Sequence, residues 1–343
     1  MSRFGAEIRA QPEAVARFVD REASTVRTIA SELQGTTIDW VVIAARGSSD
    51  NVARYGQYLL GIRNRLPVAL ATPSLYTVYQ SPPRLTRALV IGISQSGASP
   101  DVAMVIEEAR SQGCRTLAIT ADTASRLGRA ADFVLDLGIA EKAVAATMTY
   151  STSLAAMALL SMTLGGHDAD LGRLTAIPDV MQLAAERAMS SSELCVAAAP
   201  GDWFVVGRGY SYGTAFETAL KIAEVAGVHA EPYSAADVLH GPSAGIDDAS
   251  TVILIAPRGP AFAGMAEWIP ELKRRRSSLV AISDDEGMLR VSRSAFRLPG
   301  GVPEWLSPLV TVIPGQVLAL RLAEARGLDP DQPRGLRKIT ETF

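Results

Sequence analysis

Short apolar runs alternate with longer mixed stretches along the chain, and this alternation predicts the secondary structure. Continuous runs rich in Val, Ile and Leu are typical of parallel strands that are buried on both faces. They predict strands at residues 40–44, 88–93, 117–120 and 133–137, and again at 203–207, 251–256, 279–283 and 295–298. The intervening stretches predict helices at 50–60, 99–112, 144–164, 212–226, 261–276 and 308–326.

The strand pattern of the first half recurs in the second half. Trp203 follows Trp40 by 163 positions, and two other strand positions recur at the same distance, Val90 at Ile253 and Leu117 at Val280. Randomly placed strands would rarely share one offset three times, so two copies of one domain are predicted. Strands that alternate with helices form parallel sheets through right-handed crossovers. We therefore predict an α/β fold of two tandem doubly wound parallel-sheet domains.

The two copies set the predicted domain organisation. The helical linker between them is expected around residues 178–194, and the residues after 327 have no counterpart in the first copy. The predicted parts are an N-terminal helical segment (1–37), a first domain (38–166), a helical linker (167–198), a second domain (199–326) and a C-terminal tail (327–343).

The composition is that of a folded protein with a sizeable core, with 343 residues of which 48% are hydrophobic and 20% charged. The net charge of −3 gives no electrostatic footprint for nucleic acid, and the basic run 273–276 is expected to be the solvated end of a helix. Residues 144–165 are apolar, but their many Ala, Ser and Thr favour a buried helix over a membrane span. The first ten residues lack the apolar region of a secretory signal.

Two cysteines, Cys114 and Cys195, are too few for a disulfide framework, and no nearby residues have the spacing of zinc ligands. We therefore expect a reducing, cytoplasmic location and no metal or other cofactor.

Hydroxyl-rich loops follow the first two predicted strands, at the edge where open α/β sheets bind ligands. After residue 45 the chain reads Arg-Gly-Ser-Ser-Asp-Asn, and after Ile93 it reads Ser-Gln-Ser-Gly-Ala-Ser-Pro-Asp. The second loop offers three hydroxyls, an amide, a glycine and a helix start, which are the groups that a phosphate needs. The alternative is ordinary capping by Ser99 before Pro100, for which one serine would suffice. Phosphate binding is therefore favoured.

The second copy has different loops at these positions. Its strand at 251–256 is followed by Pro-Arg-Gly, without serines. Its first strand leads into Gly-Arg-Gly-Tyr-Ser-Tyr-Gly at 207–213, but no acidic residue ends a second strand about 20 residues later, as a dinucleotide site requires. This loop is therefore a weak candidate for nicotinamide binding.

Four lysines stand against 29 arginines, so lysine persists at few positions. Lys221 shares one predicted helix face with Glu217 and Glu224, which lie at positions i−4 and i+3. From spacing alone, a surface ladder of salt bridges is favoured over a functional cluster. Lys338 lies in the tail, where a solvated terminus is the simplest expectation.

The three histidines carry different expectations. His240 lies in the turn Leu-His-Gly-Pro, where a catalytic and a structural role are equally favoured. His229 lies in an apolar run and is expected to be a core residue. His167 lies in a polar linker and is expected to have no role.

These motifs resemble those of the sugar isomerase (SIS) domain family, whose doubly wound domains are flavodoxin-like. In their joint order they are similar to the isomerase half of glutamine–fructose-6-phosphate amidotransferase and to its stand-alone relatives. The resemblance extends from about residue 38 to the C-terminus, and the stretches that carry it are 94–97, 141–147, 219–224, 240–242 and 331–334.

The resemblance implies roles for individual residues. Glu224 would move a proton between C1 and C2 of a sugar, and Lys221 would support the enol oxygen. His240 would open the pyranose ring, and Lys338, in a lid-like tail, would reach the sugar carbonyl. A carboxylate and a histidine suit such proton transfers. The sugar phosphate would be held by Ser49, Ser94, Gln95, Ser96 and Ser99, with Ser48 and Val144 close to the sugar.

Two departures from the family pattern leave the substrate open. Ala146 and Met148 stand where many relatives have Ser and Lys. A glutaminase domain with a leading cysteine nucleophile is not expected, because the first cysteine of this sequence is Cys114.

The function predicted first is that of a glucosamine-6-phosphate deaminase, which converts an amino-sugar 6-phosphate to fructose 6-phosphate and ammonia. The alternatives are a fructosamine-6-phosphate deglycase, another phosphosugar isomerase or deaminase such as one for galactosamine 6-phosphate, and a non-catalytic sugar-phosphate sensor. The expected partners are a small sugar phosphate and a second copy of the chain, because relatives share the active site across a homodimer. Neither nucleic acid nor a membrane is expected as a partner.

Overall fold

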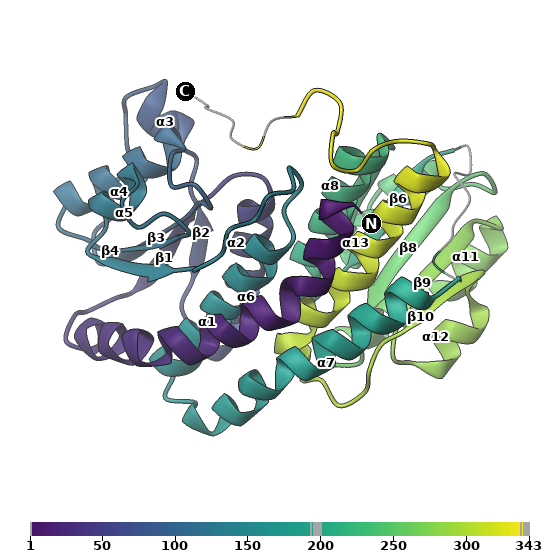
Figure 1. The fold of residues 1–343 in the computed structure, drawn as a ribbon, viewed down its shortest axis with the longest axis horizontal. Helices are drawn as coiled ribbons and strands as arrows, with labels where there is room; N and C mark the ends of the chain where they lie inside the picture. Colours follow the sequence, from purple (N-terminus) through teal and green to yellow (C-terminus); the bar gives the residue numbers. More distant parts are fainter. Residues whose placement is uncertain (1, 193, 195–200, 337, 339–343) are drawn as a thin grey trace. The chain divides into compact units, whose positions relative to one another are not determined.

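Figure 1 shows the fold in a computed structural model, which describes residues 2–192, 194, 201–336 and 338. Cys195 and the last residues of the predicted linker lie outside the described residues. The chain divides into two compact units. The N-terminal unit comprises 13–141, 148–176 and 337–343, and the C-terminal unit comprises 1–12, 142–147 and 177–336.

The N-terminal unit contains a sheet of five parallel strands in the order β2-β1-β3-β4-β5. The central strands are continuous buried apolar runs, as predicted, and β1 and β3 begin and end at the predicted residues. The short edge strand β2 was not predicted, because none of its three residues is buried and Ala69 is exposed. The strands are β1 (Trp40–Ala44), β2 (Val68–Leu70), β3 (Ala88–Ile93), β4 (Arg115–Thr120) and β5 (Phe133–Asp136).

The C-terminal unit contains a second sheet of five parallel strands, in the order β7-β6-β8-β9-β10. This is the same order as in the first sheet, so the prediction of two doubly wound copies is confirmed. The edge strand β7 was not predicted, because Pro232 and Glu231 interrupt its apolar pattern and only an edge strand tolerates the proline. The strands are β6 (Trp203–Gly207), β7 (Ala230–Ser234), β8 (Thr251–Ala256), β9 (Ser278–Ser283) and β10 (Ser294–Arg297).

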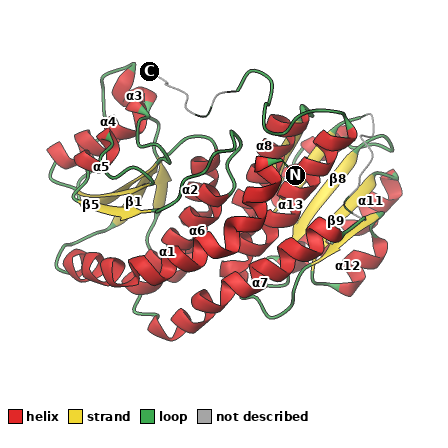
Figure 2. Cartoon of the chain, viewed as in Figure 1, coloured by secondary structure: helices red, strands yellow, loops and turns green. Residues whose placement is uncertain are grey.

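Helices lie against both sheets (Figure 2). The N-terminal segment is one long helix, α1 (Arg3–Gln34), whose residues are divided between the two units. Those of the N-terminal unit are α2 (Ser48–Arg63), α3 (Ser74–Thr77), α4 (Pro100–Ser111), α5 (Arg126–Ala130) and α6 (Met148–Leu164). Those that follow are α7 (Leu171–Ser190), which starts in the N-terminal unit, and α8 (Tyr212–Ala226), α9 (Ala235–Leu239), α10 (Phe262–Ala266), α11 (Ile269–Arg275), α12 (Glu286–Val291) and α13 (Ser307–Ala325).

Two predicted helices differ from the observed ones. The stretch 261–276 is not one helix but two, α10 and α11, because Pro270 stands in the first turn of α11 and lacks the N–H that would continue α10. The helix predicted from residue 144 begins only at Met148. The residues before it form a loop that is held by carboxylates, as described below.

Apolar helices form part of the core. Helix α6 is buried along nearly its whole length, as predicted for residues 144–165. Among the described residues, one helical stretch, Glu304–Ala325, is long and apolar enough to span a membrane by length and composition, with a mean hydropathy of 1.5. However, 94% of its apolar window is buried within the protein, and core helices pass the same test. Helix α13, which lies in this stretch, packs against α8.

Candidate functional site

The order of strands in the first sheet creates one switch point, between β1 and β3. The chain leaves these two neighbouring strands in opposite directions along the sheet, toward β2 and toward β4. A crevice forms where the connections diverge, and ligands bind there in doubly wound folds. The two loops predicted to bind phosphate follow β1 and β3 directly, so both lie at this point.

The loop after β3 holds a tight turn. The N–H of Gly97 donates to the carbonyl of Ser94 at 3.2 Å, and the φ of Gly97 is +59°. A Cβ atom at Gly97 would lie 1.9 Å from the Oγ of Ser125, so only glycine fits this turn. On the other side, the carbonyl of Gln95 accepts from the Thr120 hydroxyl and the Ala121 N–H, which fixes the loop to the end of β4.

The serines of this loop are not used for helix capping. Ser99 is the N-cap residue of α4, but its side chain makes no capping hydrogen bond. Its hydroxyl lies 3.5 Å from that of Ser94, a residue that is only 7% exposed. The Ser96 hydroxyl accepts from the N–H of Ala98 inside the loop. These hydroxyls therefore lie beside the N-terminus of α4, where the helix dipole favours an anion.

An ion pair ties the loop after β1 to the same helix. The Nε of Arg46 lies 2.7 Å from Oδ2 of Asp101, which is in the first turn of α4 and almost completely buried. Helix α2 begins two residues after Arg46, at Ser48, and Ser49 follows in its first turn. The pair thus brings the starts of α2 and α4 together. The predicted phosphate ligands, which lie in the loop after β3 and at the start of α2, therefore lie around one switch point.

The corresponding switch point of the second sheet, between β6 and β8, contains a carboxylate. Oε1 of Glu304 accepts from the N–H of Ala261 at 3.4 Å, in the loop that follows β8. A Cβ atom at Gly259 would lie 2.5 Å from the carboxyl carbon of Glu304, and one at Gly209 would lie 3.7 Å from its Oε1. Burial raises the pKa of Glu304, and the Ala261 hydrogen bond opposes this. A carboxylate at this place repels a phosphate or pyrophosphate, which agrees with the weak dinucleotide pattern of 207–213.

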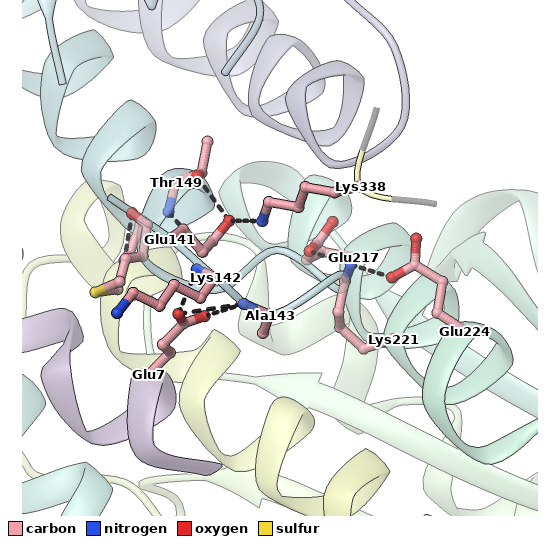
Figure 3. A network of polar contacts seen from close by, with 11 residues as sticks. Glu7, Glu141, Lys142, Ala143, Thr149, Glu217, Lys221, Glu224 and Lys338 are labelled. Atoms are coloured by element: carbon pink, nitrogen blue, oxygen red, sulfur yellow. Dashed lines mark hydrogen bonds and ion pairs between the residues drawn. The ribbon is translucent and has the colours of Figure 1, made fainter. Parts of the chain in front are cut away.

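Helix α8 of the C-terminal unit carries a cluster of three charges (Figure 3). The Nζ of Lys221 lies 3.5 Å from Oε1 of Glu217 and makes a short hydrogen bond to Oε2 of Glu224. The side chains of Lys221 and Glu217 are completely buried, whereas that of Glu224 is 21% exposed. The expectation of a surface salt-bridge ladder was therefore wrong. It failed because α13 covers α8, as the helical spacing of the charges alone does not reveal.

The burial of the three charged side chains decides which of them can contact a ligand. Taking an ion out of water costs roughly several kcal/mol, so a buried lysine needs a partner. Glu217 lies with Lys221 in the interior and cannot touch a ligand. Glu224 is the only member of the cluster that reaches the surface, so it is the one that can contact a substrate.

Two carboxylates to which the sequence analysis gave no role hold the loop before α6 (Figure 3). Glu7 of α1 accepts from the backbone N–H groups of Lys142 and Ala143, the first at 2.6 Å. These two residues precede Val144, which is partly buried. Glu7 gave no local signal because it lies 135 positions from Lys142.

Glu141 holds the other end of the same loop. Its carboxylate accepts from the backbone N–H of Thr149 at 3.1 Å and from the Thr149 hydroxyl at 2.8 Å. The Nζ of Lys338 lies 2.9 Å from Oε2 of Glu141 (Figure 3). Lys338 is therefore not the solvated terminal residue that was expected, since its side chain is only 27% exposed and ion-paired.

The histidines lie at the surface or near it. His240 is exposed and follows directly after α9. His229 is also exposed, with 81% of its side chain accessible, and its Nε2 lies 3.7 Å from Glu231. The expectation of a core residue was wrong because His229 precedes an edge strand rather than a central one. The ring of His167 lies 3.2 Å from the carbonyl of Arg63, in the N-terminal unit.

Comparison with protein families gives a match in both halves of the chain. The model of the SIS domain matches residues 39–163 and 200–325. The glutamine–fructose-6-phosphate aminotransferase of Pyrococcus horikoshii is 34% identical over 339 residues, which cover 97% of this chain and 56% of that protein. The enzyme of the same name from Thermococcus kodakarensis is 33% identical over 344 residues, which cover 97% of this chain and 56% of that protein. The chain thus spans about half the length of the curated relatives it matches.

Solved structures give the same fold. A candidate phosphosugar isomerase from Silicibacter pomeroyi is 33% identical, with a TM-score of 0.87 over 96% of this chain and 100% of that one. The glucosamine-6-phosphate deaminase of Thermotoga maritima has a TM-score of 0.78 over 99% of this chain and 100% of that one. At 21% identity, the second likeness shows the fold alone.

The raised pKa of Glu304 predicts a pH effect on stability. The folded state holds the proton of this carboxyl more tightly than the unfolded state does. Ionisation of Glu304 therefore lowers the free energy of unfolding as the pH rises above the ordinary range of a glutamate. Glu304→Gln keeps an acceptor for the Ala261 N–H but carries no charge. We expect the Tm of the variant, relative to the wild type, to increase between about pH 4 and pH 7. A Tm difference that does not change with pH would contradict the burial of a charged carboxylate.

Proposed function

Because the chain belongs to the SIS domain family in both of its halves, we propose that it is a phosphosugar isomerase that deaminates an amino-sugar 6-phosphate. The preferred substrate is glucosamine 6-phosphate, and the products are fructose 6-phosphate and ammonia. The observation that carries the proposal is the charge cluster of α8, in which a buried Lys221–Glu217 pair adjoins the partly exposed Glu224. A protein that only senses a sugar phosphate has no need of such a proton-transfer group.

The phosphate of the substrate is assigned to the switch point of the N-terminal unit. The hydroxyls of Ser94, Ser96 and Ser99 and the dipole of α4 supply donors and favourable charge. Ser49 and the Gln95 amide complete the set, and Ser48 is proposed to lie close to the sugar. The phosphate takes no part in the chemistry, so its binding energy serves to place the reacting carbons.

Glu224 is proposed to move the proton. In the open-chain form of the amino sugar, its carboxylate takes the proton from C2. The electron pair forms a C1–C2 double bond while the π pair of the C1 carbonyl moves to O1, which takes up a proton from water to give an enolamine. The same carboxyl returns its proton to C1 as the C2 nitrogen gives a proton to water, and a C2–N double bond replaces the C1–C2 double bond to leave an imine at C2. Water adds to the imine carbon and ammonia leaves, so that fructose 6-phosphate forms without any net oxidation or reduction. General acid–base catalysis of this kind needs one carboxyl that exchanges a proton with both carbons.

The remaining residues receive supporting roles. His240 is exposed and free to approach the ring oxygen of a closed sugar. Lys221 keeps a positive charge beside Glu224, and we propose that this charge favours the developing enol oxygen. Lys338 is proposed to reach the sugar carbonyl, for which its Nζ must leave Glu141. Val144 is proposed to lie close to the sugar, at the end of the segment that Glu7 holds.

A second function is favoured by the names of the relatives. Several are named glutamine–fructose-6-phosphate aminotransferase (isomerizing), a name that states transfer of an amino group between glutamine and fructose 6-phosphate. The residues assigned here would catalyse the formation of an amino sugar too if ammonia were supplied. The choice between the two functions therefore concerns direction and nitrogen source rather than the proton-transfer residues.

Turnover of glucosamine 6-phosphate tests the proposal. We expect ammonia and fructose 6-phosphate in equal amounts from the wild type. In Glu224→Gln, kcat should fall by at least about 100-fold because the proton carrier is lost, whereas binding of fructose 6-phosphate should persist. Glu324→Gln is the matched control, since Glu324 is an exposed glutamate of α13 that pairs with Arg321, and it should retain full activity.

Each contrary outcome has a definite meaning. Full activity in Glu224→Gln would overturn the assignment of the proton carrier. Stabilisation of the wild type by fructose 6-phosphate or glucosamine 6-phosphate without turnover in either direction would favour the sensor. Turnover of galactosamine 6-phosphate or of a fructosamine 6-phosphate alone would keep the isomerase chemistry and correct the substrate.

A homodimer with shared active sites is also proposed, since the exposed His240 is free to serve a second subunit. Glu224→Gln and His240→Ala should each be inactive alone. Co-expressed with different tags, they should form mixed dimers in which one of the two sites has both native residues. Activity should then recover to about a quarter of the wild-type value for random pairing of two-fold symmetric dimers. No recovery in purified mixed dimers would show that His240 acts within its own chain.

A further inference from the structure

The C-terminal unit has a basic pocket that shares no residue with the sites described above. Its volume is about 280 Å³, and it lies beside the end of α11 and the amino ends of β9 and β10. Three cationic side chains from two segments line it: Lys273 and Arg276 at the end of α11, and Arg293 just before β10. The buried side chains of Leu272 and Leu279 form part of its wall.

The four basic residues at the end of α11 make two kinds of contact. The Nε of Arg274 and that of Arg275 lie 2.9 and 2.7 Å from the carboxylate of Glu271. The hydrogen bonds from Arg274, and to a smaller extent that from Arg275, lower the pKa of Glu271 to about 2. Lys273 and Arg276 line the pocket instead. Lys273, Arg274 and Arg276 are exposed, so the expectation of a solvated helix end is confirmed.

Among the described residues, the three cations of the pocket have no partner of opposite charge. Within the part of the chain that the structure describes, none of the side chains of Lys273, Arg276 and Arg293 makes a hydrogen bond or an ion pair. One carboxylate, Asp248, also lines the pocket, so an excess of positive charge remains. Cations are favoured at helix C-termini, but α11 is short and its last turn already contains Arg274 and Arg275. Lys273 and Arg276 add to the two arginines at this helix end, and Arg293 comes from another segment, so the helix end alone does not account for the three cations.

We propose that this pocket binds a small polyanion of the pyrophosphate class, either free or as part of a phosphorylated small molecule. Two guanidinium groups and an ammonium group suit phosphate oxygens, and arginine binds them with paired hydrogen bonds. Ser278, at the start of β9, also lines the pocket, and its hydroxyl is a neutral donor for such a ligand. The volume is at the lower end for ligand pockets, which favours a ligand of two or three phosphate groups over a large one.

The pocket is separate from the substrate groups of the same unit. The pocket lies at the amino ends of β9 and β10, near one edge of the sheet. The charge cluster lies on α8, which packs on β6 and β7 near the opposite edge. A ligand in the pocket is therefore not the molecule that is turned over. This inference does not depend on the proposed function.

Calorimetry with pyrophosphate tests the inference, at low ionic strength because exposed charges are screened by salt. We expect binding to the wild type and a loss of at least about tenfold in affinity in the triple variant Lys273→Gln, Arg276→Gln, Arg293→Gln, which corresponds to one lost charge-assisted contact or more. Arg274→Gln is the matched control on the same helix and should bind as the wild type does. Asp248→Asn should bind more tightly, because it removes the one carboxylate of the pocket.

A second arm separates this pocket from the phosphate loop. The variant Ser94→Ala, Ser99→Ala should keep its affinity for pyrophosphate if the basic pocket binds it, and should lose it if the loop does. The three cations are exposed, so thermal unfolding should show that the triple variant is folded. Absence of binding to the wild type, or equal affinity in the wild type and the triple variant, would overturn the inference.

Discussion

The order β2-β1-β3-β4-β5 is the constraint on which the proposed phosphate site depends. Parallel strands place all of their carboxyl ends at one edge, and the reversal between β1 and β3 leaves the starts of α2 and α4 side by side there. The Arg46–Asp101 pair then ties the first loop to the second helix. The strand order creates the crevice at the switch point, and the serines supply the hydroxyls that line it.

The second sheet shows that topology alone does not make a phosphate site. Its strands have the same order, and its switch point has glycines that allow a close approach, but the approaching group is the carboxylate of Glu304. One copy thus presents hydroxyls at the switch point, and the other presents a negative charge. The second copy contributes a different element to the proposed chemistry, the charge cluster of α8, in which a buried ion pair supports a glutamate that reaches the surface.

Central strands were predicted well from the sequence, because burial on both faces makes them continuous apolar runs. Strands β1, β3, β6 and β8 begin and end where the pattern predicts. The edge strands β2 and β7 were missed because β2 has only three residues and β7 contains Pro and Glu, whereas the edge strands β5 and β10 were predicted almost at their observed positions. The loop Ser94–Ser99 could also be predicted, because a strand followed by small polar residues and then a helix is a pattern of neighbouring residues.

Features that depend on distant parts of the chain could not be predicted. The burial of Lys221 depends on α13, and a salt-bridge spacing looks the same on a covered and an open helix face. Glu304 meets Ala261 across 43 positions, and Glu7 meets Lys142 across 135. The exposure of His229 follows from the edge position of β7, which the apolar residues around this histidine do not indicate. In each case the partner is set by the fold rather than by neighbouring residues.

The position of the phosphate in a crystal structure of the complex with fructose 6-phosphate tests the central claim most directly. The account predicts that the phosphate lies at the start of α4, with its oxygens bonded to hydroxyls of the loop Ser94–Ser99. A phosphate bound at the switch point of the second sheet, beside Glu304, or in the basic pocket near Arg276, with the loop Ser94–Ser99 empty, would contradict it.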